Sequence, residues 1–153
     1  AYGVCSFADN ATIRITGSTR TGTGNTLYHN GRNYGLKLTV TDTTSTSSGS
    51  CGVYIAGSTS AQSNADNQNG AGGYQQATFT GCTISGALNG VEVKYTDLTL
   101  DGCTVSTTAK DASYKQDNKG PAGSGFAVVS TDNAMNNVTP KPEGTTILQR
   151  TGK

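Results

Sequence analysis

Apolar and polar residues alternate along the chain in four matching segments, 13–21, 38–46, 77–85 and 98–106. Each segment has two apolar residues two positions apart, a polar residue, Gly or Asp, and then a threonine two positions later. Alternation with a period of two is typical of half-buried β-strands. The bend positions are Gly17, Asp42, Gly81 and Gly102, where we expect either a positive φ or a tight corner that turns the chain onto the next face. The shared threonines are Thr19, Thr44, Thr83 and Thr104, which we expect to form a single file.

A second unit, Gly-apolar-x-apolar, follows each segment and begins at Gly35, Gly52, Gly90 and Gly125. A repeat of about 20–50 residues indicates a solenoid, in which each coil buries its apolar face against its neighbours. Stacking of these units places Lys37, Tyr54 and Glu92 side by side on an outward face, with Lys94 in the next column. A tyrosine between charges on a flat sheet suits sugar recognition. An ordinary cross-strand charge pair around an aromatic ring is the alternative interpretation.

Three long insertions interrupt the repeat, at 22–33, 57–76 and 107–123. The first and third follow the threonine-bearing strand, so we expect them to leave the same edge of the solenoid. The coils between them have short connections at that edge. The pattern predicts a groove with two walls, whose floor is about 10 Å wide at the usual strand spacing.

Composition supports a narrow β-solenoid over a compact two-layer fold. Only 33% of the 153 residues are hydrophobic, and the chain has 21 glycines and no tryptophan. Eleven Lys and Arg residues balance ten Asp and Glu residues, so no basic field exists to hold nucleic acid. No run of about 18 apolar residues predicts insertion into a membrane.

The four cysteines include no C-x-x-C pair, which disfavours a zinc site. Cys82 and Cys103 occupy the same column of the repeat in successive units. We expect either a stack of two small buried thiols or a disulfide.

The segment N-G-V-E-V-K-Y-T-D-L-T-L-D-G-C-T-V-S, from Asn89 to Ser106, resembles the coils of right-handed parallel β-helices of the pectin-lyase-like group. The resemblance extends over about 2–148 and implies an all-β solenoid of about four to five rungs with long loops. We expect one such domain over 1–153, as a piece of a longer protein. Further rungs or a partner chain are then expected to cover the ends of the solenoid.

Two features bear on catalysis. His29, the single histidine, lies in the first insertion beside Tyr28 and Arg32, where a general base is one interpretation and a solvated loop residue the other. Glycoside hydrolysis needs two facing carboxyl groups, and no such pair is evident in the repeat. Pectate lyases of the resembling group use clustered Asp ligands for calcium, and no such cluster matches here.

We therefore expect a non-catalytic, secreted or cell-surface module of bacterial type that binds or displays toward a polysaccharide. No cofactor, metal, nucleic acid or membrane insertion is expected. A polysaccharide lyase or glycoside hydrolase is one alternative, and a structural stalk or adhesin segment is the other. The candidate carbohydrate contacts are Tyr28, His29, Arg32, Lys37, Tyr54, Glu92, Lys94, Lys110, Tyr114 and Lys115.

Overall fold

The computed structural model describes residues 2–8, 10–29, 35–56, 75–94, 96–114, 121, 123–131 and 147–150. These residues form strands and turns, and no helix occurs among them. Consequently, the described part of the chain holds no helix able to cross a membrane.

Three larger sheets, named A, B and C here, are built of parallel strands. Sheet A has the order β1 (Val4–Ser6), β4 (Leu27–His29), β7 (Val53–Ile55), β10 (Asn89–Lys94), β15 (Phe126–Thr131) and β16 (Ile147–Arg150). Sheet B contains β2 (Thr12–Thr16), β5 (Lys37–Thr41), β8 (Gln75–Thr80) and β11 (Thr96–Asp101). Sheet C contains β3 (Thr19–Gly22), β6 (Thr44–Ser47), β9 (Thr83–Gly86) and β12 (Thr104–Thr107).

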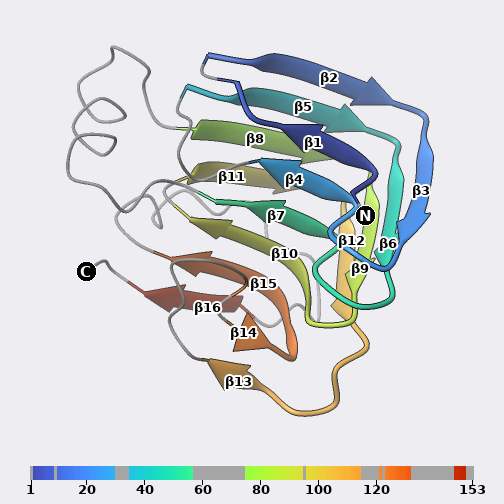
Figure 1. Ribbon diagram of the computed structural model, residues 1–153, viewed down its shortest axis with the longest axis vertical. Helices are drawn as coiled ribbons and strands as arrows, with labels where there is room; N and C mark the ends of the chain where they lie inside the picture. Colours follow the sequence, from blue (N-terminus) through green and yellow to red (C-terminus); the bar gives the residue numbers. More distant parts are fainter. Residues whose placement is uncertain are drawn as a thin grey trace.

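The chain visits sheets A, B and C in that order four times, from β1 to β12, and each strand pairs with the strand three places along (Figure 1). Each circuit is thus one coil of a solenoid-like stack. A short antiparallel pair, β13 (Ser113–Tyr114) with β14 (Gly123–Ser124), precedes the return to sheet A at β15. The expected all-β, parallel, stacked architecture is confirmed at this level.

The threonine file predicted from the repeat is present in sheet C. Thr19 pairs with Thr44, Thr44 with Thr83, and Thr83 with Thr104. The preceding strands stack in the same register in sheet B, where Ile13, Leu38, Ala77 and Leu98 form one inward column. The four segments therefore define two of the three sheets.

The bends between sheets B and C have the predicted conformation. Gly17, Gly81 and Gly102 have φ values of 57°, 62° and 59°, and Asp42 takes the same conformation at 47°. Glycine adopts the left-handed conformation without a steric penalty because it has no Cβ. Asp tolerates this conformation because its short polar side chain can form local hydrogen bonds. One such residue in each coil turns the chain from one sheet to the next.

The interior is a single column of apolar side chains from all three sheets. Sheet B contributes Phe79 and Leu100, which are almost wholly inaccessible to solvent. Sheet A contributes Val53, Val91 and Val93, each fully buried. Burial of one such side chain stabilises the fold by about 1.5–3 kcal/mol, so a narrow interior suffices because every coil shares it with its neighbours.

The register predicted for sheet A is wrong at two of its four units. Gly52-Val53-Tyr54 and Gly90-Val91-Glu92 stack as expected. Gly35, however, is the corner before sheet B, with φ 69°, at the position that Asn10 takes in the first coil with φ 53°. The last unit is offset by two residues, since Phe126 pairs with Asn89 rather than with Val91.

Candidate functional site

The outer face of sheet A does not repeat a single residue type from coil to coil. Cys5, Tyr28, Tyr54, Glu92 and Val129 follow one another in register along this face. Their neighbours in the strands point inward and form the core. The outer face therefore combines thiol, aromatic, acidic and aliphatic side chains on strands that pair in regular register.

An aromatic row follows this column at the β1 end. The rings of Tyr2 and Tyr28 stack with centroids 4.7 Å apart, and those of Tyr28 and Tyr54 stack at 5.8 Å. Phe7 meets the Tyr28 ring edge-on at 5.9 Å. Parallel-displaced and edge-on contacts are both favourable geometries for aromatic pairs. We call Tyr2, Phe7, Tyr28 and Tyr54 the aromatic row.

Exposure falls steadily along the aromatic row. Phe7 is 61% exposed and Tyr2 52%, whereas Tyr28 is half-buried and Tyr54 only 2% exposed. Tyr2 and Phe7 are the large apolar side chains that the described surface exposes. Both contact Tyr28, so the exposed apolar surface is concentrated in one place.

A buried polar cluster continues the face beyond Tyr54. The Glu92 carboxylate accepts a hydrogen bond from Asn89 Nδ2 at 3.0 Å and lies 3.9 Å from Lys94 Nζ. Lys94 Nζ also sits 5.4 Å from the centre of the Tyr54 ring. Glu92 is fully buried and Lys94 almost so. A buried charge is tolerated only when paired and hydrogen-bonded, so this cluster ties β7 and β10 together.

Cys51 lies against the same carboxylate, with its Sγ 3.9 Å from Glu92 Oε2. Burial, reinforced by the negative charge of Glu92, raises the pKa of the Cys51 thiol far above its ordinary value. The thiol is therefore protonated and unreactive at neutral pH.

Four of the sequence-predicted contacts, Tyr28, Tyr54, Glu92 and Lys94, come together on the outer face of sheet A. Their expected exposure is wrong for three of them, because Tyr54, Glu92 and Lys94 are buried. Lys37 does not belong to this group. It begins β5 in sheet B, pairs with Thr12 and Gln76, and is exposed. Its place beside Tyr54 is taken by Tyr28.

The predicted groove is not formed as expected, because the insertion 22–33 contains strand β4. His29 lies on that strand at the register of the core residue Ile55 and is 1% exposed. It therefore faces the interior instead of lining a wall. Arg32 and Lys115 lie outside the described residues. Lys110 is exposed after β12, and Tyr114 belongs to β13.

Cys82 and Cys103 are free thiols in adjacent coils, which matches the stacked arrangement. They belong to a corner column in which each side chain donates to the carbonyl oxygen two residues earlier. Cys82 Sγ donates to Thr80 O at 3.4 Å and Cys103 Sγ to Asp101 O at 3.5 Å. Thr43 and Ser18 make the same contact in the preceding coils, at 3.0 and 3.1 Å. A hydrogen-bonding side chain just after the bend is thus a structural feature of every coil.

Sequence reasoning missed Tyr2, Phe7, Asn89 and Cys51. Tyr2 and Phe7 flank the three-residue strand β1 and lie outside the repeating units, so no periodicity marks them. Asn89 directly precedes Gly90, which begins one of the Gly-apolar-x-apolar units. That position is the one sequence feature that could have indicated a role for Asn89.

Metal binding has no candidate among the described residues, where no three His, Cys, Asp or Glu side chains come together. Comparisons with protein families, with curated proteins and with solved structures found no match to the chain.

Proposed function

We propose that the chain is a non-catalytic module of a right-handed parallel β-helix, secreted or on a cell surface, that binds polysaccharide through the aromatic row. The observation that carries this proposal is the position of Tyr2 and Phe7. Exposed aromatic side chains gathered at one place mark an interaction site. Tyrosine combines a flat apolar ring with a hydroxyl group, as recognition of a sugar ring requires.

The architecture suits an extended ligand better than a small one. Strands β1, β4 and β7 lie side by side along the direction in which the coils stack (Figure 1). The ring contacts of Tyr2, Tyr28 and Tyr54 follow the same direction. Burial of Tyr54 fixes one end of the row, and the stack on Tyr28 holds Tyr2 in place. Side chains already ordered before binding lose less entropy when the ligand arrives.

A binding role agrees better than turnover with the charges on this face. Glu92 is the carboxylate found on the described outer face of sheet A, and it is buried in an ion pair with Lys94. Glycoside hydrolysis uses two carboxyl groups across the scissile bond. The arrangement around Glu92 instead resembles a structural ion pair.

Affinity gel electrophoresis against a panel of neutral and acidic polysaccharides tests the proposal. Tyr2→Ala and Phe7→Ala are the informative variants, because both side chains are exposed and their removal leaves the core intact. We expect each to weaken retention about tenfold, equivalent to about 1.4 kcal/mol. Lys37→Ala is the matched control, because it changes an exposed residue on sheet B. The absence of retention of the wild type on every gel contradicts the proposal, as does retention unchanged by both aromatic variants.

A further inference from the structure

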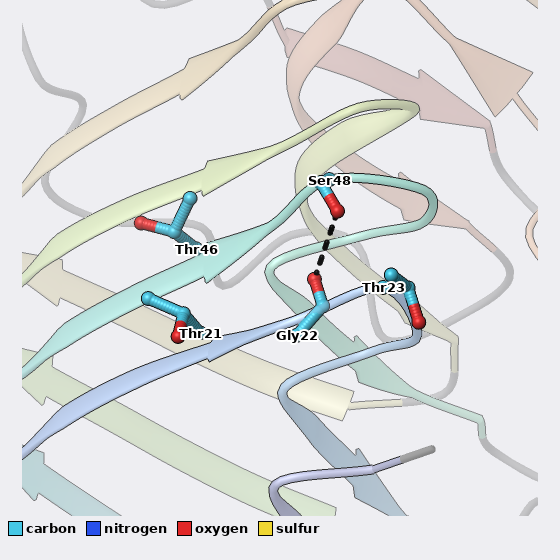
Figure 2. A pocket seen from close by; sticks show the side chains of 5 residues that line it. All are labelled: Thr21, Gly22, Thr23, Thr46 and Ser48. Atoms are coloured by element: carbon cyan, nitrogen blue, oxygen red, sulfur yellow. Dashed lines mark hydrogen bonds between the residues drawn. The ribbon is translucent and has the colours of Figure 1, made fainter.

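A hollow of about 290 Å³ opens on sheet C at the ends of β3 and β6, and Figure 2 shows its lining. Thr21 and Thr46 stand side by side on the two paired strands. Gly22, Thr23 and Ser48 complete the lining where the chain leaves the sheet. We call this the hydroxyl hollow.

The corner around the hydroxyl hollow is fixed by hydrogen bonds. Ser48 donates to the Gly22 carbonyl oxygen through its backbone N–H at 2.8 Å and through its hydroxyl at 3.4 Å. Ser47 Oγ donates to Gly24 O at 2.7 Å. The corners that follow β3 and β6, 23–26 and 48–52, are longer than the two-residue corner 87–88 after β9. The hollow thus occurs where two coils have long, braced corners.

Its hydroxyl groups retain hydrogen-bonding capacity for a ligand. Within the part of the chain that the structure describes, the hydroxyls of Thr21 and Thr23 make no hydrogen bond to protein. Thr46 Oγ1 accepts from Ser85 Oγ at 3.3 Å, which leaves its own hydrogen available to donate. Ser48 Oγ donates to Gly22 and so keeps its lone pairs. The hollow presents both donors and acceptors, as a sugar hydroxyl does.

The lining carries no charge. Arg20, although next to Thr21 in sequence, points to the other side of the strand, where it pairs in register with the buried Ser45. Its Cδ lies 3.4 Å from the position that a Cβ on Gly3 would occupy, inside the coil. No described cation lines the hollow to attract a uronate or a phosphate.

We infer that the hydroxyl hollow binds one uncharged sugar residue through Thr21, Thr46 and Ser48. Its volume is just below the range of about 300–1,000 Å³ for small-molecule pockets, which fits a single ring. This site goes beyond the function proposed above because it lies on sheet C. Either site can fail while the other stands.

An NMR titration of the ¹⁵N-labelled chain tests this inference, with methyl α-glucopyranoside and methyl β-galactopyranoside as neutral probes and sodium glucuronate as the charged one. We expect saturable amide shifts at residues 21–23 and 46–48 with at least one neutral probe, and much weaker shifts with glucuronate. Thr21→Val and Thr46→Val keep the side-chain shape and remove one hydroxyl each. Each should weaken binding about fivefold, as the loss of one hydrogen bond implies.

Thr104→Val is the control, since it makes the same change on sheet C two coils away from the hollow, and it should leave the titration unchanged. The double variant Tyr2→Ala/Phe7→Ala should also leave it unchanged, which separates this site from the aromatic row. Circular dichroism confirms the fold of each variant. The inference is overturned by a lack of saturable shifts with both neutral probes, by equal binding of glucuronate, or by Thr21→Val and Thr46→Val binding as the wild type does.

Discussion

A single methyl group at Gly102 tests the bend that turns the chain from sheet B to sheet C in the fourth coil. Gly102 has φ 59°, and a Cβ built on it meets no atom within 4 Å. Gly102→Ala therefore isolates the backbone cost from any steric clash. The left-handed conformation costs a residue with a Cβ about 1–2 kcal/mol. Alanine recovers about 0.4–1 kcal/mol by restricting the unfolded chain, so we expect a net loss of about 1 kcal/mol.

Two matched variants separate this cause from others. Gly102→Asn should lose less than Gly102→Ala, because asparagine tolerates the left-handed region. Gly22→Ala introduces the same methyl group at a glycine without a positive φ, where the nearest atoms lie at 3.9 and 4.0 Å. That variant should be neutral, or more stable by about 0.4–1 kcal/mol.

Urea unfolding followed by far-UV circular dichroism measures these differences. Because coils of a solenoid can unfold in steps, the slope of each transition must match that of the wild type before free energies are compared. In thermal unfolding, Gly102→Ala should lower the midpoint by about 2–4 °C. If Gly102→Ala and Gly22→Ala shift the midpoint equally, the positive φ of the corner is not what requires glycine, and the reasoning fails.

Three further changes have definite expected outcomes. Gly90→Ala places a Cβ 2.5 Å from a Val105 methyl and 2.7 Å from two backbone carbonyl oxygens, so urea unfolding should show a loss of about 3 kcal/mol, well above that of a corner glycine. Glu92→Gln leaves the buried Lys94 ammonium without its carboxylate and should lower the free energy of unfolding by about 3 kcal/mol. Because the two side chains interact, the double variant Glu92→Gln/Lys94→Met should lose less stability than the sum of the two single variants. The raised pKa of Cys51 keeps its thiol protonated in the folded protein, whereas the thiol of the unfolded chain ionises at about pH 8.5. The free energy of unfolding should therefore fall above that pH, by up to about 1.4 kcal/mol per pH unit. Cys51→Ala should show a shallower fall in the same titration, and an identical pH profile would contradict this assignment.

The sequence predicted sheets B and C correctly because each repeat segment contains its own bend. The two apolar residues, the bend and the threonine lie within nine residues, so no loop of variable length intervenes. Register then follows from alternation, which excludes a shift by one residue, together with the bend at a constant place in each segment. Thr19 to Thr104 therefore align as predicted.

Sheet A was harder to predict because corners of variable length flank its strands. Strand β4 has three residues, and one of its two inward positions is occupied by His29, which breaks the apolar pattern. The segment from Gly35 to Leu38 matches the Gly-apolar-x-apolar unit better than β4 does, yet Gly35 is a corner residue with a positive φ. Because Gly35 resembles the start of a sheet A unit, the pattern wrongly predicts Lys37 in sheet A. Because β4 lacks an apolar pattern, the pattern predicts a loop there, and with it the groove.

The difference between sheet A and the regular sheets B and C also explains why the candidate sites were only partly predictable. In sheet C one outer column repeats a single residue type at Thr19, Thr44, Thr83 and Thr104. In sheet A the outer column runs from Cys5 through Tyr28 and Tyr54 to Glu92, so it does not repeat one residue type. A repeat reveals what every coil shares, whereas a residue such as Glu92, which occurs in one coil only, cannot be identified from it.

The two proposed sites both lie where the coils depart from uniformity. The aromatic row depends on residues that flank β1 and on the two tyrosines that follow it, and the hydroxyl hollow depends on the long corners after β3 and β6. Shortening the corner after β6 to the two-residue form found after β9 should therefore abolish the hollow while sheet C and its threonine file remain. The repeat segments form the stacked sheets, whereas both proposed sites also depend on residues or corners that vary from coil to coil.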